Sequence, residues 1–445
     1  MAGEMQTPHT PSAAVALRSD WSWMRLDAVC DGVFDCPHST PVLSEDGPYV
    51  ARSQDMRSGV FRTDEAARVS EATYKERIAR AEPRHGDLLY SREGTYFGIA
   101  AEVPLGVRVC LGQRMVLLRP RPSLVSSRFL QYWLNSPEMA LHTYGHRDGS
   151  VAERLNLPTI RGLPVAVPPL NEQRAIAHIL GTLDDKIELN RRMNETLEAM
   201  ARALFKSWFV DFDPVRARAE GRDPGLPQPL ADLFPDSFED SELGEIPKGW
   251  EVRSLDEIAR FLNGLALQKY PPTDGCSLPV IKIAQLREHN TNGADRASAD
   301  LEPDHVVQDG DIVFSWSGSL ECVFWAGGPG ALNQHLFKVT SADFPRWLCY
   351  LAIHQHLDAF RHIAAGKATT MGHIQRHHLS EAKVAVPSPG LLTAMDTVLQ
   401  PMVESTWGRT AESRTLAALR DALLPKLVSG DLRLSVTQPQ RTGAQ

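Results

Sequence analysis

One stretch, from Pro168 to Phe212, constrains the fold of this chain more than any other. Apolar residues recur in it at intervals of seven, which is the spacing of a coiled-coil stripe. Two prolines at its start exclude an earlier helix, and Asp213-Pro214 marks its end. About 38 helical residues would span roughly 57 Å. Such a helix is longer than an ordinary core helix, although a bundle helix within a globular domain is the alternative.

The pattern recurs 219 residues later, which predicts a second long helix over 388–430. Pro401 is expected to interrupt or kink this second helix near its start. Two such helices in one chain most simply pair with each other in antiparallel fashion. The polar residues Asn190 and Arg409 either fix the register of this pair or are solvent-exposed interruptions of a loosely packed seam. The predicted seam consists of Ile176, Leu183, Asn190, Leu197 and Leu204 in the first helix and of Met395, Met402, Arg409, Leu416 and Leu423 in the second. Ile179, Met193 and Met200 supply much of a second seam in the first helix.

The segments before the two helices also repeat. GDLLYS at 86–91 corresponds to GDIVFS at 310–315, and VAVP at 165–168 corresponds to VAVP at 384–387. The predicted fold class is α+β, with two mixed α/β domains joined by two long antiparallel coiled-coil helices and a pseudo-twofold internal repeat. The predicted boundaries are a disordered tail (1–20), a first domain (21–167), a first helix (168–212), an acidic, proline-rich linker (213–247), a second domain (248–387), a second helix (388–430) and a tail (431–445).

Composition narrows the possible functions only weakly. The net charge of −8 and the pI of about 6.0 argue against a nucleic-acid binder, but 211–247 alone carries ten acidic residues against three arginines. The remainder is therefore close to neutral. Six cysteines form no CxxC pair, and the chain shows neither a secretory leader nor an apolar run of membrane-spanning length. We therefore expect a cytoplasmic protein with reduced, buried thiols.

Motifs for catalysis are missing from the sequence. It has no [DN]PP[FYW], GxxxxGK[ST], GxGxxG or GxSxG motif. Histidines of the second domain could be combined into a metal site, but they complete no recognised ligand set, and we predict no metal. A hydrolase that uses these histidines is a competing hypothesis. The histidines are His354, His356, His362, His373, His377 and His378.

The local residue composition of the two domains favours contact with DNA. The first domain is rich in arginine, the residue that most often reads guanine, while Asn and Gln read adenine. Small polar turns follow the strands that begin with GD, and further polar turns precede the two VAVP segments. The alternative is that the GD…S…G pattern only forms a tight structural turn, which we favour for its glycines. The residues expected to contact DNA are Ser91, Arg92, Gln113, Arg147, Arg154, Ser315, Ser317, Gln334, Lys367, Thr369 and His373.

The sequence resembles the specificity (S) subunits of type I restriction–modification systems. The resemblance rests on the run from 165 to 217, on LGEIPKGWEV at 243–252 and on LLPKLVSGDLRL at 423–434. The paired GD and [GN]Q turns add to it, and together these features cover nearly the whole chain. The second half departs from the pattern, because it lacks the PPLxEQRxI motif of the first half.

The resemblance implies a non-catalytic subunit. Each domain would be a target-recognition domain that reads one half of a bipartite double-stranded DNA site. The helix pair would set the spacing of the halves and dock two methyltransferase (M) subunits, through which motor-nuclease (R) subunits join. S-adenosylmethionine, ATP and magnesium would be bound by these partners and no cofactor by this chain, and no membrane is implied. The alternatives are a structural adaptor that reads no sequence, and a partner system that only methylates.

Overall fold

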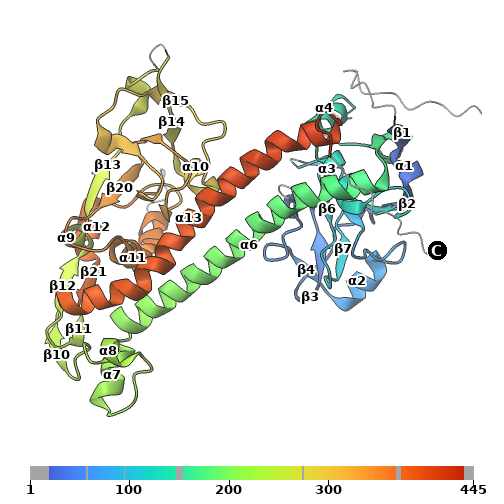
Figure 1. The fold of residues 1–445 in the computed structure, drawn as a ribbon. Coiled ribbons are helices and arrows are strands. Elements are labelled where there is room, and N and C mark those ends of the chain that lie inside the picture. Colours follow the sequence, from blue (N-terminus) through green and yellow to red (C-terminus); the bar gives the residue numbers. More distant parts are fainter. Residues whose placement is uncertain are drawn as a thin grey trace, which may run out of the picture. The chain divides into compact units, whose positions relative to one another are not determined.

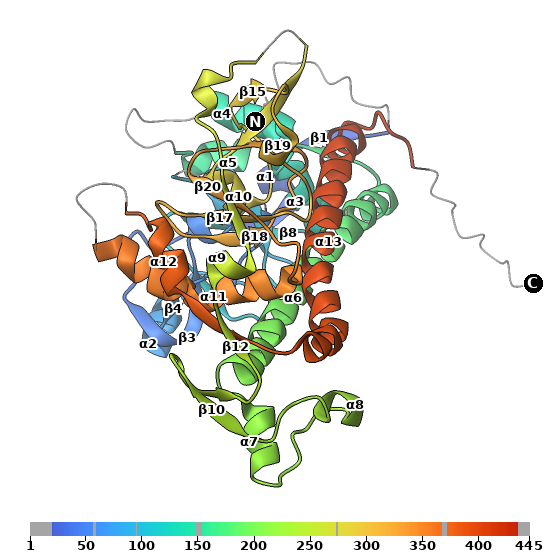
Figure 2. The same cartoon turned by 90° about the vertical axis from the view of Figure 1, so that its left-hand side faces the viewer.

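The computed structural model describes residues 20–56, 59–94, 96–146, 154–272, 275–366 and 372–434. These residues form two compact units. The first consists of the described parts of 1–185 and 417–445, and the second of those of 186–416. Each of the two long helices contributes one part to each unit, so each unit contains a domain and a piece of both helices. Figures 1 and 2 show the elements of both units in the order of the sequence colours.

The first unit is built on small antiparallel and mixed sheets. One sheet has the strand order β2-β8-β5-β6 and a second has the order β4-β3-β7, in which β3 and β7 are parallel. Strands β1 and β9 form a separate antiparallel pair that joins the start of the domain to its end. The elements are β1 (Ser22–Arg25), α1 (Leu26–Val29), β2 (Cys30–Asp35), β3 (Leu43–Ala51), η1 (Ser53–Asp55), β4 (Arg68–Val69), α2 (Glu71–Arg77), β5 (Leu88–Ser91), β6 (Ala100–Glu102), β7 (Val109–Leu111), β8 (Met115–Pro120), α3 (Ser127–Leu134), α4 (Pro137–Gly145), α5 (Leu157–Gly162) and β9 (Pro164–Val167).

The second unit repeats this topology. Its sheets have the orders β13-β20-β17-β18 and β15-β14-β19-β16, with β14 and β19 parallel, and β12 pairs with β21 as β1 pairs with β9. The elements are α7 (Asp213–Ala219), α8 (Gln228–Ala231), β10 (Phe238–Ser241), β11 (Gly244–Pro247), β12 (Glu251–Ser254), α9 (Leu255–Ile258), β13 (Arg260–Asn263), η3 (Leu267–Lys269), β14 (Ser277–Ile281), α10 (Ile283–Glu288), β15 (Arg296–Ser298), η4 (Pro303–His305), β16 (Val306–Val307), β17 (Ile312–Ser315), β18 (Cys322–Phe324), β19 (Gly330–Leu332), β20 (Leu336–Thr340), α11 (Arg346–Gly366), α12 (Arg376–Glu381) and β21 (Lys383–Val386).

The two long helices are α6 (Leu170–Phe209) and α13 (Pro389–Val428), and they pair in antiparallel fashion. In the first unit, an Arg420 amino group donates to Asp184 over 2.8 Å. In the second unit, the Asn190 amide donates to the Glu412 carboxylate over 2.8 Å. The predicted fold class, with two mixed domains and a paired-helix repeat, is therefore confirmed.

Burial along the pair differs between the predicted seam residues. Ile176, Asn190 and Met395 are buried, whereas Leu183, Leu197, Leu204, Met402, Arg409, Leu416 and Leu423 are half-buried. Met200, which was expected in the second seam of the first helix, is 46% exposed. A strict heptad stripe serves one partner helix, but each part of this pair also packs against a domain. Buried aromatic residues such as Phe205 and Trp208 of α6 therefore belong to the core of the second unit.

Segment 213–247, which was predicted to be a linker, contains two short helices and the β10–β11 hairpin. Val215, Phe234 and Ile246 are buried in the same core as Trp250. Prolines occupy the first turns of α7 and α8, where no hydrogen bond is lost. The many prolines and acidic residues suggested a linker. The few apolar residues among them become buried only when the segment packs against the rest of the second unit.

Pro401 does not interrupt the second long helix, which is continuous through it. Its ribbon turns near the N-terminal end (Figures 1 and 2), as a kink at a proline would produce. Packing of the helix start against the domain compensates for the missing hydrogen bond, since Leu391, Met395 and Leu399 are all buried. None of the described helices is both long and apolar enough to cross a membrane.

Candidate nucleic-acid interface

In the first unit, polar residues gather at one end of the larger sheet. Strand β5 ends at Ser91 opposite the start of β8, and β2 ends there at Asp35. The backbone of Glu93, just beyond β5, bridges to that of Arg154. Antiparallel pairing thus brings segments far apart in the sequence to one edge. We call Asp35, Arg92, Glu93, Arg114 and Arg154 the first polar cluster.

The arginines of this cluster differ in their freedom. Arg92 donates from Nη1 to Asp35 over 3.1 Å, and both side chains are more than four-fifths buried. Arg114 is 52% exposed, and its Nε lies 3.2 Å from Oε1 of Glu93. Arg154 is exposed. The cluster therefore presents Arg114 and Arg154 to a ligand more readily than Arg92.

The predicted glutamine and serine of this unit have different surroundings. Gln113 is exposed, and its side-chain carbonyl accepts a hydrogen bond from Thr40 over 3.1 Å. Ser91 is buried, and its hydroxyl has no hydrogen-bond partner among the described residues. The hydroxyl of Ser91 thus points into the domain in this conformation, and Gln113 lies at the surface beside the first polar cluster.

The second unit has a corresponding group at the same end of its sheet, which we call the second polar cluster: Trp316, Ser317, Gln334, His335 and His373. Ser317 and His373 form the backbone bridge that Glu93 and Arg154 form in the first unit. The Ser317 hydroxyl lies 2.9 Å from Nδ1 of His335, and the Trp316 indole donates to the backbone carbonyl of Gln334 over 3.2 Å. This cluster has no arginine or lysine, so it offers hydrogen bonds and aromatic faces instead of fixed positive charge.

The remaining predicted contact residues fall into two groups. Ser315 is buried, and its hydroxyl donates to the backbone carbonyl of Ser319 over 2.8 Å, which makes it part of the turn itself. Arg147, Lys367 and Thr369 lie outside the described residues. These three belong to segments that immediately follow α4 and α11 and precede the two backbone bridges.

The GD pairs that open β5 and β17 have a structural role. Gly86 and Gly310 have φ angles of 90° and 88°, which favour glycine. Asp87 accepts from the backbone N–H of Arg84 over 3.0 Å and from Arg119 over 2.7 Å. Asp311 likewise accepts from the backbone N–H of Gln308 over 2.7 Å. The repeated motif thus fixes a turn at the end of the sheet opposite to the polar cluster.

One arginine of the first domain is committed to the fold. Arg77 is 5% exposed and donates to three backbone carbonyl groups, those of Leu111, Ser39 and Pro37. These bonds hold the segment that follows β2 against β7. Counting arginines in the sequence therefore overstated the number available to DNA.

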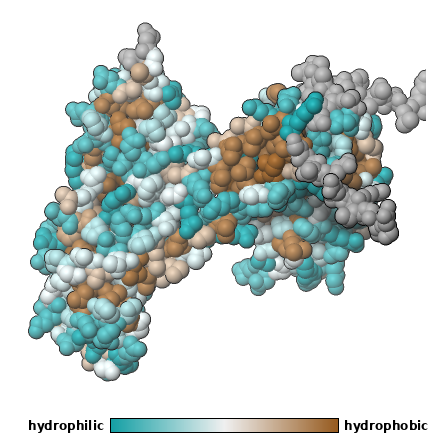
Figure 3. Space-filling view, viewed as in Figure 1, coloured by the Kyte–Doolittle hydropathy of each residue, from teal (hydrophilic) through white to brown (hydrophobic). Residues whose placement is uncertain are grey.

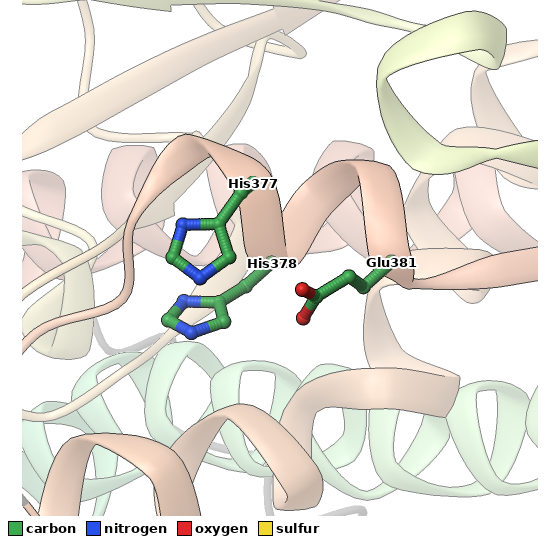
Figure 4. A group of neighbouring side chains, drawn as sticks. All are labelled: His377, His378 and Glu381. Carbon is green, nitrogen blue, oxygen red and sulfur yellow. The ribbon is translucent and has the colours of Figure 1, made fainter.

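Three potential metal ligands lie together on α12 (Figure 4). The ligand atoms of His377, His378 and Glu381 lie within 4.8 Å of one another. Nδ1 of His378, however, accepts the backbone N–H of Gln375 over 2.9 Å, as a helix cap. A neutral imidazole that accepts at Nδ1 carries its proton on Nε2, which leaves no lone pair for a metal ion. The arrangement therefore fits a helix cap better than a metal centre.

Five of the six cysteines are buried. Burial raises the pKa of the Cys30 thiol to about 12 and that of the Cys110 thiol to about 11. Cys276 is exposed, contrary to the expectation that all six thiols are buried. A raised pKa keeps a thiol protonated and unreactive at neutral pH. The buried cysteines thus act as small apolar residues of the core.

Comparison with known families agrees with the repeat. A family model described as "Type I restriction modification DNA specificity domain" matches residues 43–199 and 247–390, well over half of the chain. The first match extends from the first domain into α6, and the second covers the second domain and ends at the first residues of α13. The family model therefore matches the chain twice, once over each of the two repeated domains.

Relatives with curated descriptions cover most of the chain. It is 25% identical over 406 residues to the type I restriction enzyme HindI specificity subunit of Haemophilus influenzae, which covers 78% of this chain and 87% of the relative. It is 26% identical over 421 residues to the MjaIX specificity subunit of Methanocaldococcus jannaschii, covering 90% and 87%. The crystal structure of a type I S subunit from M. genitalium covers 93% of this chain and 96% of its own, with a TM-score of 0.54 and 14% identity, which shows a common fold.

Proposed function

The chain belongs to the type I restriction–modification DNA specificity family and is a specificity subunit, and we propose that each of its domains reads one half of a bipartite DNA site. The observation that carries this proposal is the duplicated topology in which both copies place a polar cluster at the same end of the same sheet. Two copies of one scaffold with different side chains are suited to reading two different sequences.

The helix pair is the proposed spacer and docking surface. Exposed apolar side chains lie along it, with Leu189 51%, Met200 46% and Leu419 47% exposed. Figure 3 shows an apolar area along the outer side of the C-terminal part of α13. A contiguous apolar area of this kind is typical of a surface that binds another protein. We propose that these residues contact the methyltransferase subunits, through which motor-nuclease subunits would join.

Each unit also has a cavity beside the helix pair that supports docking of two equal partners. A cavity of about 470 Å³ in the second unit is lined by α11, the start of β18 and both long helices. One of about 400 Å³ in the first unit is lined by the corresponding elements, α3 and α4, the turn before β6 and both long helices. Repeated cavities at equivalent places suit two copies of the same partner.

The proposed role needs no catalysis by this chain. The absence of recognised catalytic motifs from the sequence supports it, as does the use of the most suggestive histidine, His378, as a helix cap. S-adenosylmethionine, ATP and magnesium would then be bound by the partner subunits. A purified complex should bind DNA with a steep dependence on salt, because contacts to phosphates release counterions.

A domain exchange tests the proposal. Residues 21–165 are replaced by the corresponding domain of another specificity subunit, and the methylated sites of the assembled complex are mapped by sequencing. We expect one half of the recognised sequence to change and the other half to persist. The matched control exchanges 250–386 and should change only the other half. Unchanged sites after both exchanges would instead support a structural adaptor.

A further inference from the structure

The side chain that reads DNA in the first domain is, we infer, Arg114, which recognises a guanine while Glu93 holds it in place. This inference rests on the proposed DNA-reading function and names the residues that perform it. Neither residue stands out in the sequence, because each is one charged residue among many. Only the fold brings the turn before β8 beside the end of β5.

The geometry of Arg114 leaves its recognition edge open. Its Nε faces Oε1 of Glu93 at 3.2 Å, and the side chain is 52% exposed. Its terminal amino groups have no hydrogen-bond partner among the described residues, and Nη1 passes over Gly94, where an added Cβ would lie 3.7 Å away. Two parallel N–H donors match O6 and N7 of guanine in the major groove. A guanidinium that is ion-paired with a carboxylate on its Nε side and free at both amino groups is therefore available for bidentate contact.

Glu93 is the positioning residue. Its side chain is 23% exposed, and its backbone is fixed by the bridge to Arg154. The neighbouring Arg92 cannot take over the reading role in this conformation, because Asp35 occupies its Nη1 in a largely buried pair. Within the first polar cluster, Arg114 is thus both largely exposed and paired with a second side chain.

The second domain replaces both partners at equivalent positions. Ser317 forms the bridge that corresponds to that of Glu93, and His335 precedes β20 as Arg114 precedes β8. The Ser317 hydroxyl lies 2.9 Å from Nδ1 of His335, so a side-chain contact between the two positions is also present in the second domain. Asn333 and Gln334 extend this network through a hydrogen bond of 2.9 Å. One scaffold position therefore carries a charged reader in one copy and a neutral hydrogen-bonding network in the other.

The test uses the complex of the full chain with its methyltransferase subunits. Adenine methylation is measured on a pool of duplexes in which each half-site is randomised in turn, and the products are sequenced. Arg114→Ala should reduce discrimination at one guanine-containing base pair of the half read by the first domain by about 10- to 100-fold. Arg114→Lys keeps the charge without the planar fork and should also lose discrimination. The other half-site should be unchanged.

Variants of Glu93 separate positioning from folding. Glu93→Ala should broaden the preference at the same base pair, and Glu93→Gln, which keeps an acceptor oxygen, should restore much of it. The unfolding temperature should be the same for both variants, since the backbone bridge does not depend on the carboxylate. A broadened preference at many base pairs, or a lowered unfolding temperature, would contradict the positioning role.

Arg121 supplies the matched control. It is 45% exposed and pairs with Asp31 over 2.8 Å, but it follows β8 at the opposite end of the strand. Arg121→Ala should leave the sequence profile unaltered. If Arg114→Ala weakens binding equally on all sequences and lowers the salt dependence by about one ion, Arg114 contacts a phosphate and the inference is wrong.

The inference and the proposed function fail in different ways. A wild-type complex without any sequence preference would refute the proposed function. A wild-type complex with a clear bipartite preference, together with an Arg114→Ala profile identical to it, would refute only the inference. As a gain-of-function test, Ser317→Glu combined with His335→Arg should introduce a guanine preference at one base pair of the second half-site.

Discussion

Two arginines of the first domain show how position decides the role of a residue. Arg77 is buried and bonds to three carbonyl groups, whereas Arg114 is half-exposed and bonds to one carboxylate at most. A buried cation that is removed leaves its acceptors without partners in a region that water does not reach. An exposed cation leaves its partner in water. We therefore expect Arg77 to govern stability, whereas Arg114 is free to contact a ligand.

Arg77→Ala should lower the free energy of unfolding of the first domain by about 2–4 kcal/mol, because the buried guanidinium is lost and three backbone carbonyl groups lose their donor. Hydrogen exchange of the segments around Pro37 and Leu111 should rise most, since Arg77 joins them. The measurement is thermal unfolding of the complex combined with hydrogen exchange. Arg121→Ala, an exposed change, should cost at most about 1 kcal/mol. Equal effects of the two variants would show that Arg77 is not structural.

The pairing of α6 with α13 depends on polar contacts as well as on apolar ones. Asn190 is fully buried, and its amide donates to Glu412 over 2.8 Å and to Ser413 over 3.2 Å. Asn194 donates to the backbone carbonyl of Thr406 over 2.9 Å. Such contacts form at one alignment of the helices only, so they favour one register in a seam where several residues are half-buried.

Asn190→Asp should destabilise the helix pair by about 2–4 kcal/mol, because it replaces a buried donor with a carboxylate that faces Glu412. The loss should appear as a lower unfolding temperature in circular dichroism at 222 nm. Asn171→Asp is the control, since Asn171 is exposed in the first turn of α6, where the helix dipole favours a negative charge. A variant Asn190→Asp as stable as this control would show that the pair does not use this contact.

At the scale of the whole molecule, the boundary between the two units crosses both long helices at matched positions. It lies between residues 185 and 186 in α6 and between 416 and 417 in α13. Contacts of the pair occur on both sides of it, from Asp184 to Arg420 in one unit and from Lys186 to Glu412 in the other. The helix pair can therefore be lengthened there without altering the contacts within either unit.

Insertion of one heptad at both positions should lengthen the spacer of the DNA site by about three base pairs, since seven helical residues add about 10.5 Å and DNA rises about 3.4 Å per base pair. Both half-sequences should persist. Methylation mapping of a library of spacer lengths measures the change. Insertion into α6 alone should abolish specific methylation, because it moves the paired side chains out of register. An unchanged spacer after the double insertion would exclude the helix pair as the spacer.

The sequence by itself determined the repeat and the two long helices, because heptad spacing and repeated strand motifs are local patterns that survive without knowledge of partners. It also pointed to the turns after the GD strands, one of which lies beside Glu93. Only the tertiary structure decided which polar residues are free. It buried Ser91 and Arg77, paired Arg92 with Asp35, and exposed Arg114 and Met200.

The same distinction explains the remaining differences. Segment 213–247 packs into the second unit, and Pro401 lies within a continuous helix. His378 caps its own helix through a bond whose donor lies three residues before it. Burial and hydrogen bonding depend on neighbours that are distant in the chain, so residue type and spacing cannot specify them. The sequence thus defined the architecture of this specificity subunit, and the fold decided which polar residues are exposed to a ligand.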